Sequence, residues 1–416
     1  MKPTTFSELD LADSLQRAIK DENYQTPTPI QAEAIPHLLA GRDLLGSAQT
    51  GTGKTAAFAL PILHRLDTQR RVALPGTPRV LVLSPTRELA AQIGDSFQTY
   101  GRHIKFRQAV IFGGVSQHTQ VRALSRGVHV VVATPGRLLD LMEQGHVDLS
   151  GLETFVLDEA DRMLDLGFLP DLKRIVAKLP RDRHSLFFSA TMPPRVAQLA
   201  AGLLQNPVRV EVSPQSATVN SIAQRVLFVQ NADKRELLLR LVRGTEIHRA
   251  LIFTRTKRGA DRVAKQLNQE GRRADAIHGN KSQNARTRTL GEFRRGRVRL
   301  LVATDLAARG IDVEGISHVI NYDMPLEAES YVHRIGRTGR AGADGIALSF
   351  CDSNERSCLR AIEKLIQTTI PVDADHPFHV QRAASSNQRP NKSNQRPNKK
   401  VSRDRRHRRG KPALAS

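Results

Sequence analysis

The chain has 416 residues, enough for two α/β domains with extensions, because single cores seldom grow beyond about 250–300 residues. Its 63 Lys and Arg against 41 Asp and Glu give a net charge of +22, which favours a polyanionic partner, either nucleic acid or an anionic membrane surface. Two cysteines and no metal-ligand spacing predict neither disulfides nor a structural metal.

The start of the chain has no apolar core typical of a signal peptide, and no run approaches the roughly 20 apolar residues that span a bilayer. We therefore expect a soluble, cytoplasmic protein. Residues 6–22 predict one amphipathic helix, and prolines in residues 23–31 predict an extended lead-in to a helix that Gln31 opens and that runs to Leu39. From the residues alone, a cap on the core and a functional segment are equally open.

Residues 43–55 read Asp-Leu-Leu-Gly-Ser-Ala-Gln-Thr-Gly-Thr-Gly-Lys-Thr, which predicts an apolar strand, a glycine turn and a helix from Lys54. Gly51 and Gly53 allow consecutive backbone N–H groups and the helix N-terminus to point at one polyphosphate. Lys54 would reach the terminal phosphates, and the Thr55 hydroxyl would ligate Mg²⁺. The alternative is a tight turn that only joins a strand to a helix.

Apolar runs and helical patterns alternate after this cradle. We predict strands at 80–84, 108–112, 129–133, 154–158 and 185–189, with helices starting near Arg87, Ser116, Gly136, Leu169 and Arg195. Continuous apolar strands are typical of a parallel sheet that is buried on both faces. A doubly wound α/β domain follows, with its sites at the carboxyl ends of the strands.

An acidic motif, Asp158-Glu159-Ala160-Asp161, closes one of these strands. One carboxylate would hold Mg²⁺ while the next polarises a water for in-line attack on a phosphate. A solvated acidic turn is the alternative. Ser189-Ala190-Thr191 closes another strand, and its two hydroxyls are candidates to link the nucleotide site to the rest of the domain.

Three further turns follow strands: Pro85-Thr86-Arg87-Glu88-Leu89, Gly113-Gly114 and Thr134-Pro135-Gly136-Arg137. Their small residues, hydroxyls, helix-start amides and arginines suit a sugar-phosphate backbone. Each taken alone is also compatible with a plain strand-to-helix turn.

Residues 206–219 lose the helical pattern and predict an interdomain linker. A second α/β domain then follows, with strands at 225–229, 250–254, 273–277, 299–303, 318–322 and 346–350 but no second cradle. Its stretch 331–340, Tyr-Val-His-Arg-Ile-Gly-Arg-Thr-Gly-Arg, would present arginines to transition-state charge on a γ-phosphate. A solvated basic turn or a nucleic-acid patch is the alternative.

The last part of the chain, from residue 373, is predicted to be a basic, disordered tail. After His379 it carries twelve Lys and Arg against one Asp and repeats Asn-Gln-Arg-Pro-Asn-Lys. Nonspecific RNA contact is one interpretation, and a solubilising extension is the other.

Together these motifs resemble those of the DEAD-box ATP-dependent RNA helicases of superfamily 2, and the core sequence is similar to that of the bacterial RhlE type. About nine motifs occur in the family's order over roughly residues 4–370. Ala48, where the general cradle pattern has glycine, gives the helicase-type version Ala-x-Thr-Gly-x-Gly-Lys-Thr. One departure is Asn23, where the family usually has glycine.

The resemblance implies two tandem RecA-like doubly wound domains, residues 1–205 and 220–372, joined by the linker 206–219 and followed by the tail 373–416. Within the first, a segment over residues 4–32 would read adenine. The implied nucleotide contacts are Phe6, Tyr24 stacking on adenine, Gln31 bonding its edge, the cradle Ala48, Gln49, Thr50, Gly51, Thr52, Gly53, Lys54 and Thr55, and Asp312 at the ribose.

The resemblance also implies the catalytic and RNA-binding groups. Lys54 and Thr55 would hold phosphates and Mg²⁺, and Asp158 would hold the Mg²⁺ through water. Glu159 would position the attacking water. Arg337 and Arg340 would be arginine fingers. Asp161, Ser189, Thr191 and His333 would couple the sites. One RNA strand would be gripped by Pro85, Arg87, Gly114, Thr134, Gly136 and Arg137 on one domain and by Arg286, in Gln283-x-x-Arg286, and Thr304 on the other.

The expected function is ATP-dependent unwinding of short RNA duplexes, or remodelling of RNA–protein complexes, by closure of the two domains with ATP and Mg²⁺ as cofactors. RNA would bind with little sequence preference, and ribosomal precursors or RNA-decay proteins are candidate partners, with ribosome biogenesis as a candidate setting. An ATP-gated RNA clamp that hardly unwinds, and a double-stranded DNA translocase, stay as alternatives.

Overall fold

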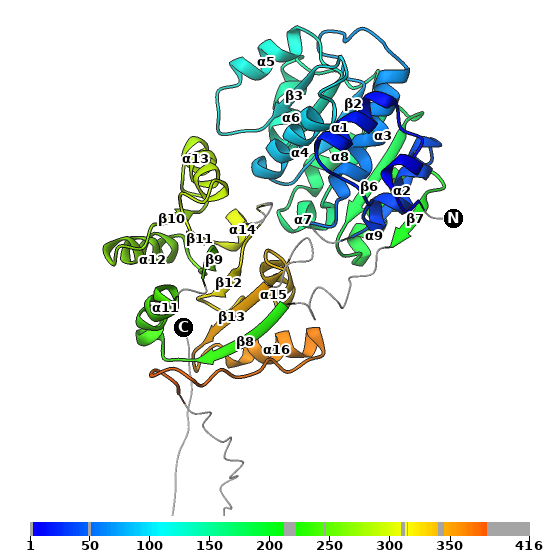
Figure 1. Ribbon diagram of the computed structural model, residues 1–416. Helices are drawn as coiled ribbons and strands as arrows, with labels where there is room; N and C mark the ends of the chain where they lie inside the picture. The colour runs from blue at the N-terminus through cyan, green and yellow to red at the C-terminus, as the bar shows by residue number, and fades with distance from the viewer. Residues whose placement is uncertain are drawn as a thin grey trace, which may run out of the picture. The chain divides into compact units, whose positions relative to one another are not determined.

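The computed structural model describes residues 3–48, 51–211, 222–244, 247–308, 313, 315–339 and 345–380. By its internal contacts the chain divides into Met1–Val380 and Gln381–Ser416, and the second unit lies outside the described residues. Within the first unit we call residues 3–211 the first lobe and residues 222–380 the second lobe; each is built on one sheet (Figure 1).

The sheet of the first lobe has the strand order β3-β4-β2-β5-β6-β1-β7, and every pair of neighbours is parallel. Its strands are β1 (Leu44–Ser47), β2 (Val80–Leu83), β3 (Gln108–Ile111), β4 (Val130–Ala133), β5 (Thr154–Leu157), β6 (His184–Ser189) and β7 (Val208–Glu211). Its helices are η1 (Phe6–Glu8), α1 (Asp13–Asp21), α2 (Pro29–Leu39), α3 (Lys54–Thr68), α4 (Arg87–Tyr100), α5 (His118–Ser125), α6 (Pro135–Glu143), α7 (Ala160–Asp165), α8 (Leu169–Val176) and α9 (Pro194–Leu203).

The sheet of the second lobe has the order β10-β11-β9-β12-β13-β8 and is also parallel. Its strands are β8 (Ile222–Phe228), β9 (Ala250–Phe253), β10 (Ala274–Ile277), β11 (Leu300–Ala303), β12 (His318–Asn321) and β13 (Gly345–Cys351). Its helices are η2 (Asn231–Asp233), α11 (Lys234–Arg243), α12 (Lys257–Gln269), α13 (Gln283–Arg294), α14 (Asp305–Ala308), α15 (Ala328–Ile335) and α16 (Arg356–Ile366). The prediction of two doubly wound parallel-sheet domains is confirmed.

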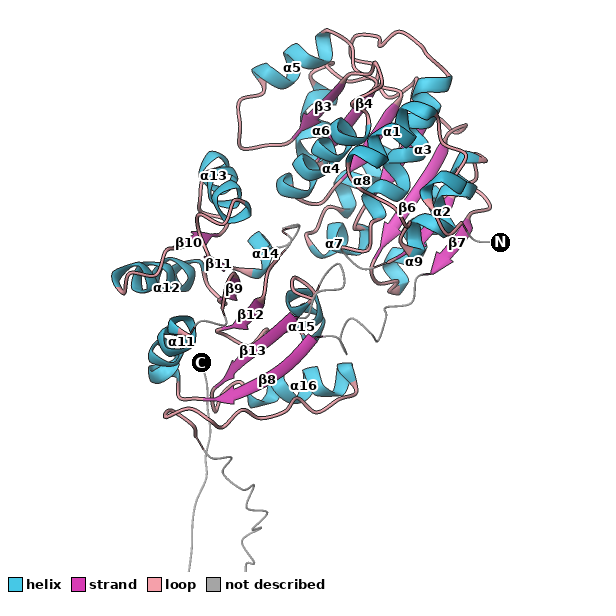
Figure 2. Cartoon of the chain, in the orientation of Figure 1, coloured by secondary structure: helices cyan, strands magenta, loops and turns pink. Residues whose placement is uncertain are grey.

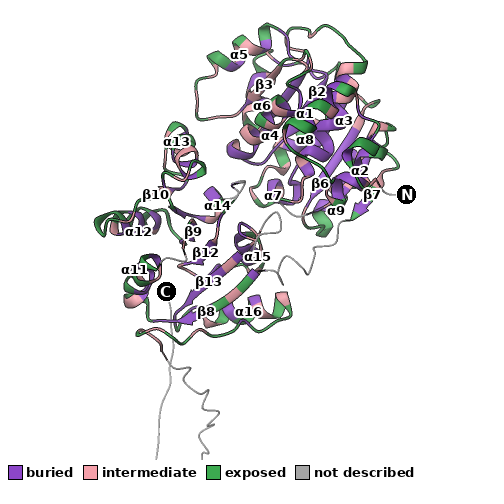
Figure 3. Ribbon diagram, in the orientation of Figure 1, coloured by how far each residue is buried: buried purple, intermediate pink, exposed green. Residues whose placement is uncertain are grey.

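Burial explains why the strands are continuously apolar. Along β2, Val80 and Val82 pack into one buried cluster, while Leu81 and Leu83 pack into another on the opposite face. Successive side chains of a strand point to opposite faces, so a strand covered by helices on both faces needs apolar residues at every position. Figure 2 shows helices around both sheets, and Figure 3 shows the strands as mostly buried.

The N-terminal segment differs from its prediction. Residues 6–22 do not form one helix: η1 ends at Glu8, and α1 begins only at Asp13. Leu9 and Leu11 are buried in the non-helical stretch between them, so their apolar side chains serve the core without a helical repeat. Helix α2 begins at Pro29, two residues before Gln31, because proline is favoured in the first helical turn.

Two predicted domain boundaries also shift. The linker was expected from residue 206, but Val208–Glu211 forms β7, which pairs with β1 at the edge of the sheet. The tail was expected from residue 373, but residues 371–380, which we call the strap, lie along the edge strand β8. The Val226 N–H donates to the Pro371 carbonyl at 2.9 Å, and the Val380 N–H donates to the Phe228 carbonyl at 3.1 Å.

Among the described residues, no helix combines the length and the apolar character needed to cross a bilayer.

The strap generates a prediction about stability. Truncation after Ile370 removes its backbone hydrogen bonds to β8 and the packing of Phe378 on the core of the second lobe. We expect the melting temperature of that lobe to fall by about 5–10 °C, whereas truncation after Val380 leaves it unchanged. Calorimetry of the two truncated chains and the full chain measures the difference. Equal melting temperatures for all three would show that the strap contributes nothing.

Candidate active site

The cradle lies between β1 and α3, as the sequence predicts. Gly51 and Gly53 have φ of +86° and +93°, in the region where glycine carries no steric penalty. Lys54 is the first residue of α3 and is only 6% exposed, and its Nζ donates to the Ala48 carbonyl at 2.9 Å. The ammonium group therefore lies across the turn that carries it. Gln49 and Thr50 lie outside the described residues, while Thr52 and Thr55 are half-buried.

Gln31 fastens the N-terminal segment to the cradle. Its Oε1 accepts from the Thr28 N–H at 2.9 Å, and its Nε2 donates to the Gly53 carbonyl at 3.1 Å. A Cβ on Gly53 would overlap Gln31 Nε2 and would lie 2.8 Å from Thr28 Oγ1. Glycine at position 53 is thus needed twice, for its φ and for this close approach.

Tyr24 and Phe6 lie one behind the other. Their ring centroids are 6.2 Å apart with planes 25° from parallel, and Phe6 is 3% exposed whereas Tyr24 is 41% exposed. Phe6 therefore supports the Tyr24 ring rather than presenting a face of its own. Asn23 has φ of +57°, a conformation that asparagine tolerates better than most residues, so its place beside Tyr24 is compatible with the backbone there.

Asp158 and Glu159 are buried at the carboxyl end of β5, 2% and 4% exposed. Glu159 has φ of +51° and forms an ion pair with Arg162, one turn further on α7. Burial raises the pKa of Asp158, although Lys54 opposes this. Burial alone would also raise the pKa of Glu159, but Arg162 and Lys54 more than offset it and hold that pKa low. Glu159 is therefore ionised at neutral pH.

Asp161 links the acidic motif to the end of β6. Its Oδ2 accepts from the Thr191 N–H at 2.8 Å and from the Thr191 hydroxyl at 2.9 Å. Its own N–H donates to the Ser189 hydroxyl at 3.2 Å, which in turn donates to the Thr191 carbonyl at 2.7 Å. The structure thus brings three of the predicted coupling residues together in one hydrogen-bond network.

The first-lobe residues predicted to hold RNA gather at the carboxyl ends of β2, β3 and β4. A hollow of about 570 Å³ is lined there by Pro85, Arg87, Thr134, Gly136 and Arg137. A Cβ on Gly114 would overlap the Arg87 guanidinium, so this glycine leaves room for that side chain. From the second lobe, Arg286 lines the same hollow, whereas Thr304 does not and is 8% exposed at the end of β11.

Glu88 is a residue that the sequence analysis missed. It is 6% exposed, and its carboxylate accepts from Gln283 Nε2 at 3.0 Å and pairs with Arg286 Nη2 at 3.0 Å. The predicted RNA contact Arg286 is therefore already paired with an acid of the first lobe. The signal in the sequence was that Glu88 is an acidic residue directly beside Arg87, the one basic residue of this turn.

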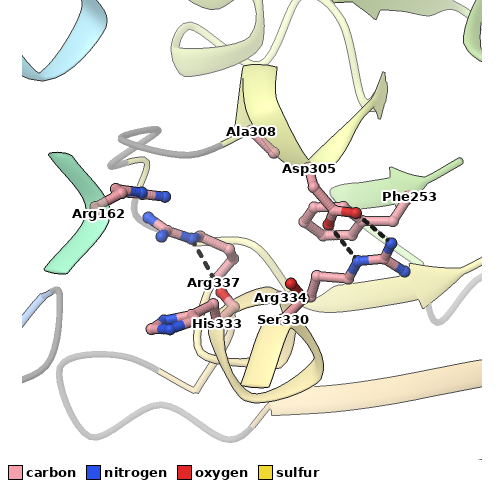
Figure 4. A pocket seen from close by; sticks show the side chains of 8 residues that line it. All are labelled: Arg162, Phe253, Asp305, Ala308, Ser330, His333, Arg334 and Arg337. Carbon is pink, nitrogen blue, oxygen red and sulfur yellow. Dashed lines mark hydrogen bonds and ion pairs between the residues drawn. The ribbon is translucent and has the colours of Figure 1, made fainter. Parts of the chain in front are cut away.

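In the second lobe, the arginine-rich stretch divides into two roles. Arg334 is 2% exposed; its Nε and Nη2 bind the two Asp305 carboxylate oxygens at 2.5 and 2.7 Å, and its guanidinium lies over the Phe253 ring (Figure 4). Arg337 instead lines a pocket with His333 and Arg162, and its Nε donates to the His333 carbonyl at 3.3 Å. Burial lowers the pKa of His333, and the nearby Arg162 and Arg337 lower it further.

Arg334 thus links α15 to Asp305 of α14. Among the described arginines of this stretch, Arg337 is therefore the candidate for the arginine-finger role. The other predicted finger, Arg340, and the predicted ribose contact, Asp312, lie outside the described residues.

The donor set fits a magnesium ion held partly by phosphates. Among the described residues, no three His, Cys, Asp or Glu side chains cluster as a metal site. Mg²⁺ commonly takes only one or two protein oxygen ligands and completes its shell with phosphate and water. The Asp158 carboxylate and the Thr55 hydroxyl are hard oxygen donors of that kind, and a cation would favour the ionised form of the buried Asp158.

Two parallel-sheet lobes, one with a phosphate cradle and a buried acidic pair, are typical of the P-loop nucleotide-binding proteins. Two family models match the chain: residues 28–199 match the DEAD/DEAH box helicase domain, and residues 233–342 match the helicase conserved C-terminal domain. The chain belongs to the DEAD-box ATP-dependent RNA helicases, a family of ATPases and helicases.

Relatives and solved structures support this assignment. The chain is 44% identical to the DEAD-box ATP-dependent RNA helicase CshA of Bacillus cereus over 361 residues, 87% of this chain and 68% of CshA. It is 45% identical to ATP-dependent RNA helicase DeaD of Escherichia coli over 369 residues, 88% of this chain and 58% of DeaD. The RhlE-like subtype stays a prediction.

Among solved structures, Saccharomyces cerevisiae Dbp5 bound to RNA and ADP BeF3 matches 89% of this chain and 96% of its own, with 34% identity and a TM-score of 0.78. A DEAD box protein from Methanococcus jannaschii matches 90% of this chain and all of its own, with 36% identity and a TM-score of 0.53.

The contact between Gly53 and Gln31 generates the second prediction. Gly53→Ala adds a methyl group against Gln31 Nε2 and strains the backbone at φ of +93°. We expect the affinity for ATP to fall about tenfold or more, measured by titration with a fluorescent nucleotide.

Gly41→Ala is the matched control. Gly41 has φ of +73°, but nothing lies within 4 Å of its Cβ position, so this substitution adds backbone strain without the clash. We expect it to lower thermal stability by about 1 kcal/mol and to leave ATP affinity unchanged. Equal losses of ATP affinity in both variants would show that Gln31 is not the reason for glycine at position 53.

Proposed function

We propose that this protein hydrolyses ATP to ADP and phosphate when it binds RNA, and that closure of its two lobes locally unwinds short RNA duplexes or remodels RNA–protein complexes. The observation that carries the proposal is the buried acidic pair. Asp158 and Glu159 are 2% and 4% exposed at the end of β5, and Arg162 keeps Glu159 ionised.

ATP would bind at the cradle of the first lobe. Tyr24 stacks on the adenine, Gln31 bonds the base edge, and Lys54 neutralises the terminal phosphates. Mg²⁺, held by Thr55 and through water by Asp158, would offset charge on the β- and γ-phosphates. Gln49, Thr50 and Asp312 stay proposed nucleotide contacts from the sequence.

Hydrolysis is an in-line displacement. A water oxygen bonds to the γ-phosphorus, the bond from that phosphorus to the bridging oxygen of ADP breaks, and a water proton passes to Glu159 and on to solvent. Because Glu159 is ionised, its carboxylate accepts a hydrogen bond from the water and thereby orients it. Arg337, with Arg340, stabilises the charge on the transferred phosphoryl group from the second lobe.

RNA would bind along the hollow lined by Arg87, Thr134 and Arg137, with Arg286 and Thr304 contributing from the second lobe. A ligand that touches both lobes favours their closed arrangement, and so ATP and RNA each raise the affinity for the other. The hollow is lined by residues of both lobes, and Glu88 of the first lobe pairs with Gln283 and Arg286 of the second, which supports a ligand that contacts both lobes there. Contacts to the RNA backbone predict low sequence specificity.

The network of Asp161, Ser189 and Thr191, with His333 nearby in the second lobe, would couple hydrolysis to release of RNA. A cytoplasmic location, ribosome biogenesis, and ribosomal precursors or RNA-decay proteins as partners are part of this proposal, and they rest on the sequence analysis alone.

The test is steady-state ATPase activity of the full chain with single-stranded RNA, with DNA of equal length, and without nucleic acid. We expect RNA to raise turnover severalfold and DNA to raise it little, because the 2′-hydroxyl distinguishes the two. Glu159→Gln should abolish the stimulated rate. Glu143→Gln is its control, since Glu143 is an exposed carboxylate paired with Arg174 on the surface.

Unwinding of a short RNA duplex completes the test. RNA-stimulated turnover with strand separation supports the proposed motor. Tight ATP-dependent binding of RNA with flat turnover and no strand separation would overturn it and favour an ATP-gated RNA clamp.

A further inference from the structure

A second basic hollow lies at the amino-terminal ends of strands β3 and β4, whereas the candidate active site lies at the carboxyl ends of the strands. Its volume is about 610 Å³, and its lining includes Arg70, Arg71, Lys105, Phe106, Arg107 and His129; we call it the amino-edge hollow. Arg107 directly precedes β3, and His129 directly precedes β4. Since these strands have four residues, about 13 Å of sheet separates this edge from the carboxyl ends that carry the predicted RNA contacts.

The rim of this hollow has an excess of positive charge. Arg70 pairs with Asp67, and Arg71 pairs with Glu153, but both arginine side chains stay largely exposed, at 79% and 65%. Lys105 is exposed and has no hydrogen-bond or ion-pair partner within the described part of the chain. Arg107 is exposed as well and donates to a backbone carbonyl, that of Arg126, which leaves its charge uncompensated.

The lining also includes apolar groups. Leu66 of α3 is buried, Phe106 is half-buried and packs in part on the core of the first lobe, and Val72 is 84% exposed. Phe106 stands between Lys105 and Arg107 in the sequence, and all three line the hollow. An aromatic ring and cations that line one hollow suit a nucleobase and its phosphates, because every base has a face that can stack.

The His129 side chain joins the two segments that carry the cations, residues 70–73 and 105–107. The Arg107 N–H donates to His129 Nδ1 at 3.0 Å, so that nitrogen is the acceptor, and Nε2 donates to the Arg71 carbonyl at 3.0 Å. The neighbouring segment is held too: Gly127 has φ of +78°, and a Cβ there would overlap the Ala73 carbonyl oxygen. The backbone segments that carry the cations are therefore held in place by hydrogen bonds and close packing.

We propose that the amino-edge hollow is a second RNA-binding site, which takes a single-stranded flank of an RNA already held at the carboxyl edge. The proposal rests on the proposed function, because the first site supplies the tether that raises the local concentration of the flank. The hollow is lined by first-lobe residues alone, so its own contacts with RNA can form in every nucleotide state, and the tether at the first site adds to them. A short RNA that is fully taken up by the path at the carboxyl ends of the strands leaves no flank for the hollow.

The test compares two RNAs: a strand of about 8 nucleotides and one of about 30 nucleotides, each with ATP analogue and with ADP. In the full chain, Lys105→Glu combined with Arg107→Glu should weaken the longer RNA on the order of tenfold in both nucleotide states. It should also reduce the slope of log affinity against log salt by about 1.4. The shorter RNA should keep its affinity and its stimulation of ATPase turnover.

The control is Lys178→Glu combined with Arg181→Glu, which makes the same change of charge at two exposed positions of the first lobe before β6. Phe106→Ala should weaken the longer RNA without altering the salt slope, because it removes stacking and no charge. Melting curves for all variants confirm that they are folded.

Three outcomes overturn the proposal. The control and the hollow variants could lose the same affinity for the longer RNA, or the hollow variants could lose it only with ATP analogue. They could also keep their affinity for the longer RNA while they lose binding of a glutamate-rich peptide. The last outcome would identify a docking site for acidic protein segments. If the wild-type chain lacks RNA-stimulated turnover yet binds the longer RNA through the hollow, the proposed function fails and this site stands.

Discussion

All the strands of each sheet run in one direction, and the arrangement of the functional residues depends on this constraint. Parallel strands bring their carboxyl ends to one edge, so the turns after β1, β2, β3, β4, β5 and β6 lie near one another although they are far apart in sequence. The cradle, the acidic motif and the predicted RNA-binding turns share that edge. The opposite edge is left for other uses, and the amino-edge hollow occupies part of it.

Buried charges are matched by specific partners near these motifs. Glu159 is balanced by Arg162, and Arg334 is balanced by Asp305 beneath the arginine-rich stretch. Lys234, 1% exposed at the start of α11, is surrounded by Asp323, Asp352 and Glu355. Such pairs do not need to add stability; removing one partner is costly, because the other charge stays buried. They therefore fix the geometry of the turns that carry the function.

The sequence was informative where one local signal determines the structure. Continuous apolar strands predicted both parallel sheets, and glycines beside Lys54 predicted the turn and the start of α3. It was less informative where tertiary contacts decide. Leu9 and Leu11 looked helical but are buried in a non-helical stretch, and the strap looked like a tail because its pairing partner β8 lies well over a hundred residues earlier. Glu88 escaped notice because its partners come from the other lobe.

The double fastening of Gln31 has a consequence for base selection. Its amide oxygen must face the Thr28 N–H and its amide nitrogen the Gly53 carbonyl, so rotating the amide by half a turn would break both hydrogen bonds. One N–H and one lone pair of the amide are then left for a nucleotide base, in a fixed order. Adenine offers the complementary donor and acceptor, whereas guanine offers two acceptors on the corresponding edge, a mismatch that costs about 1–3 kcal/mol. If Gln31 binds the base as proposed, the same contacts that hold the cradle in place would also make the site prefer ATP to GTP.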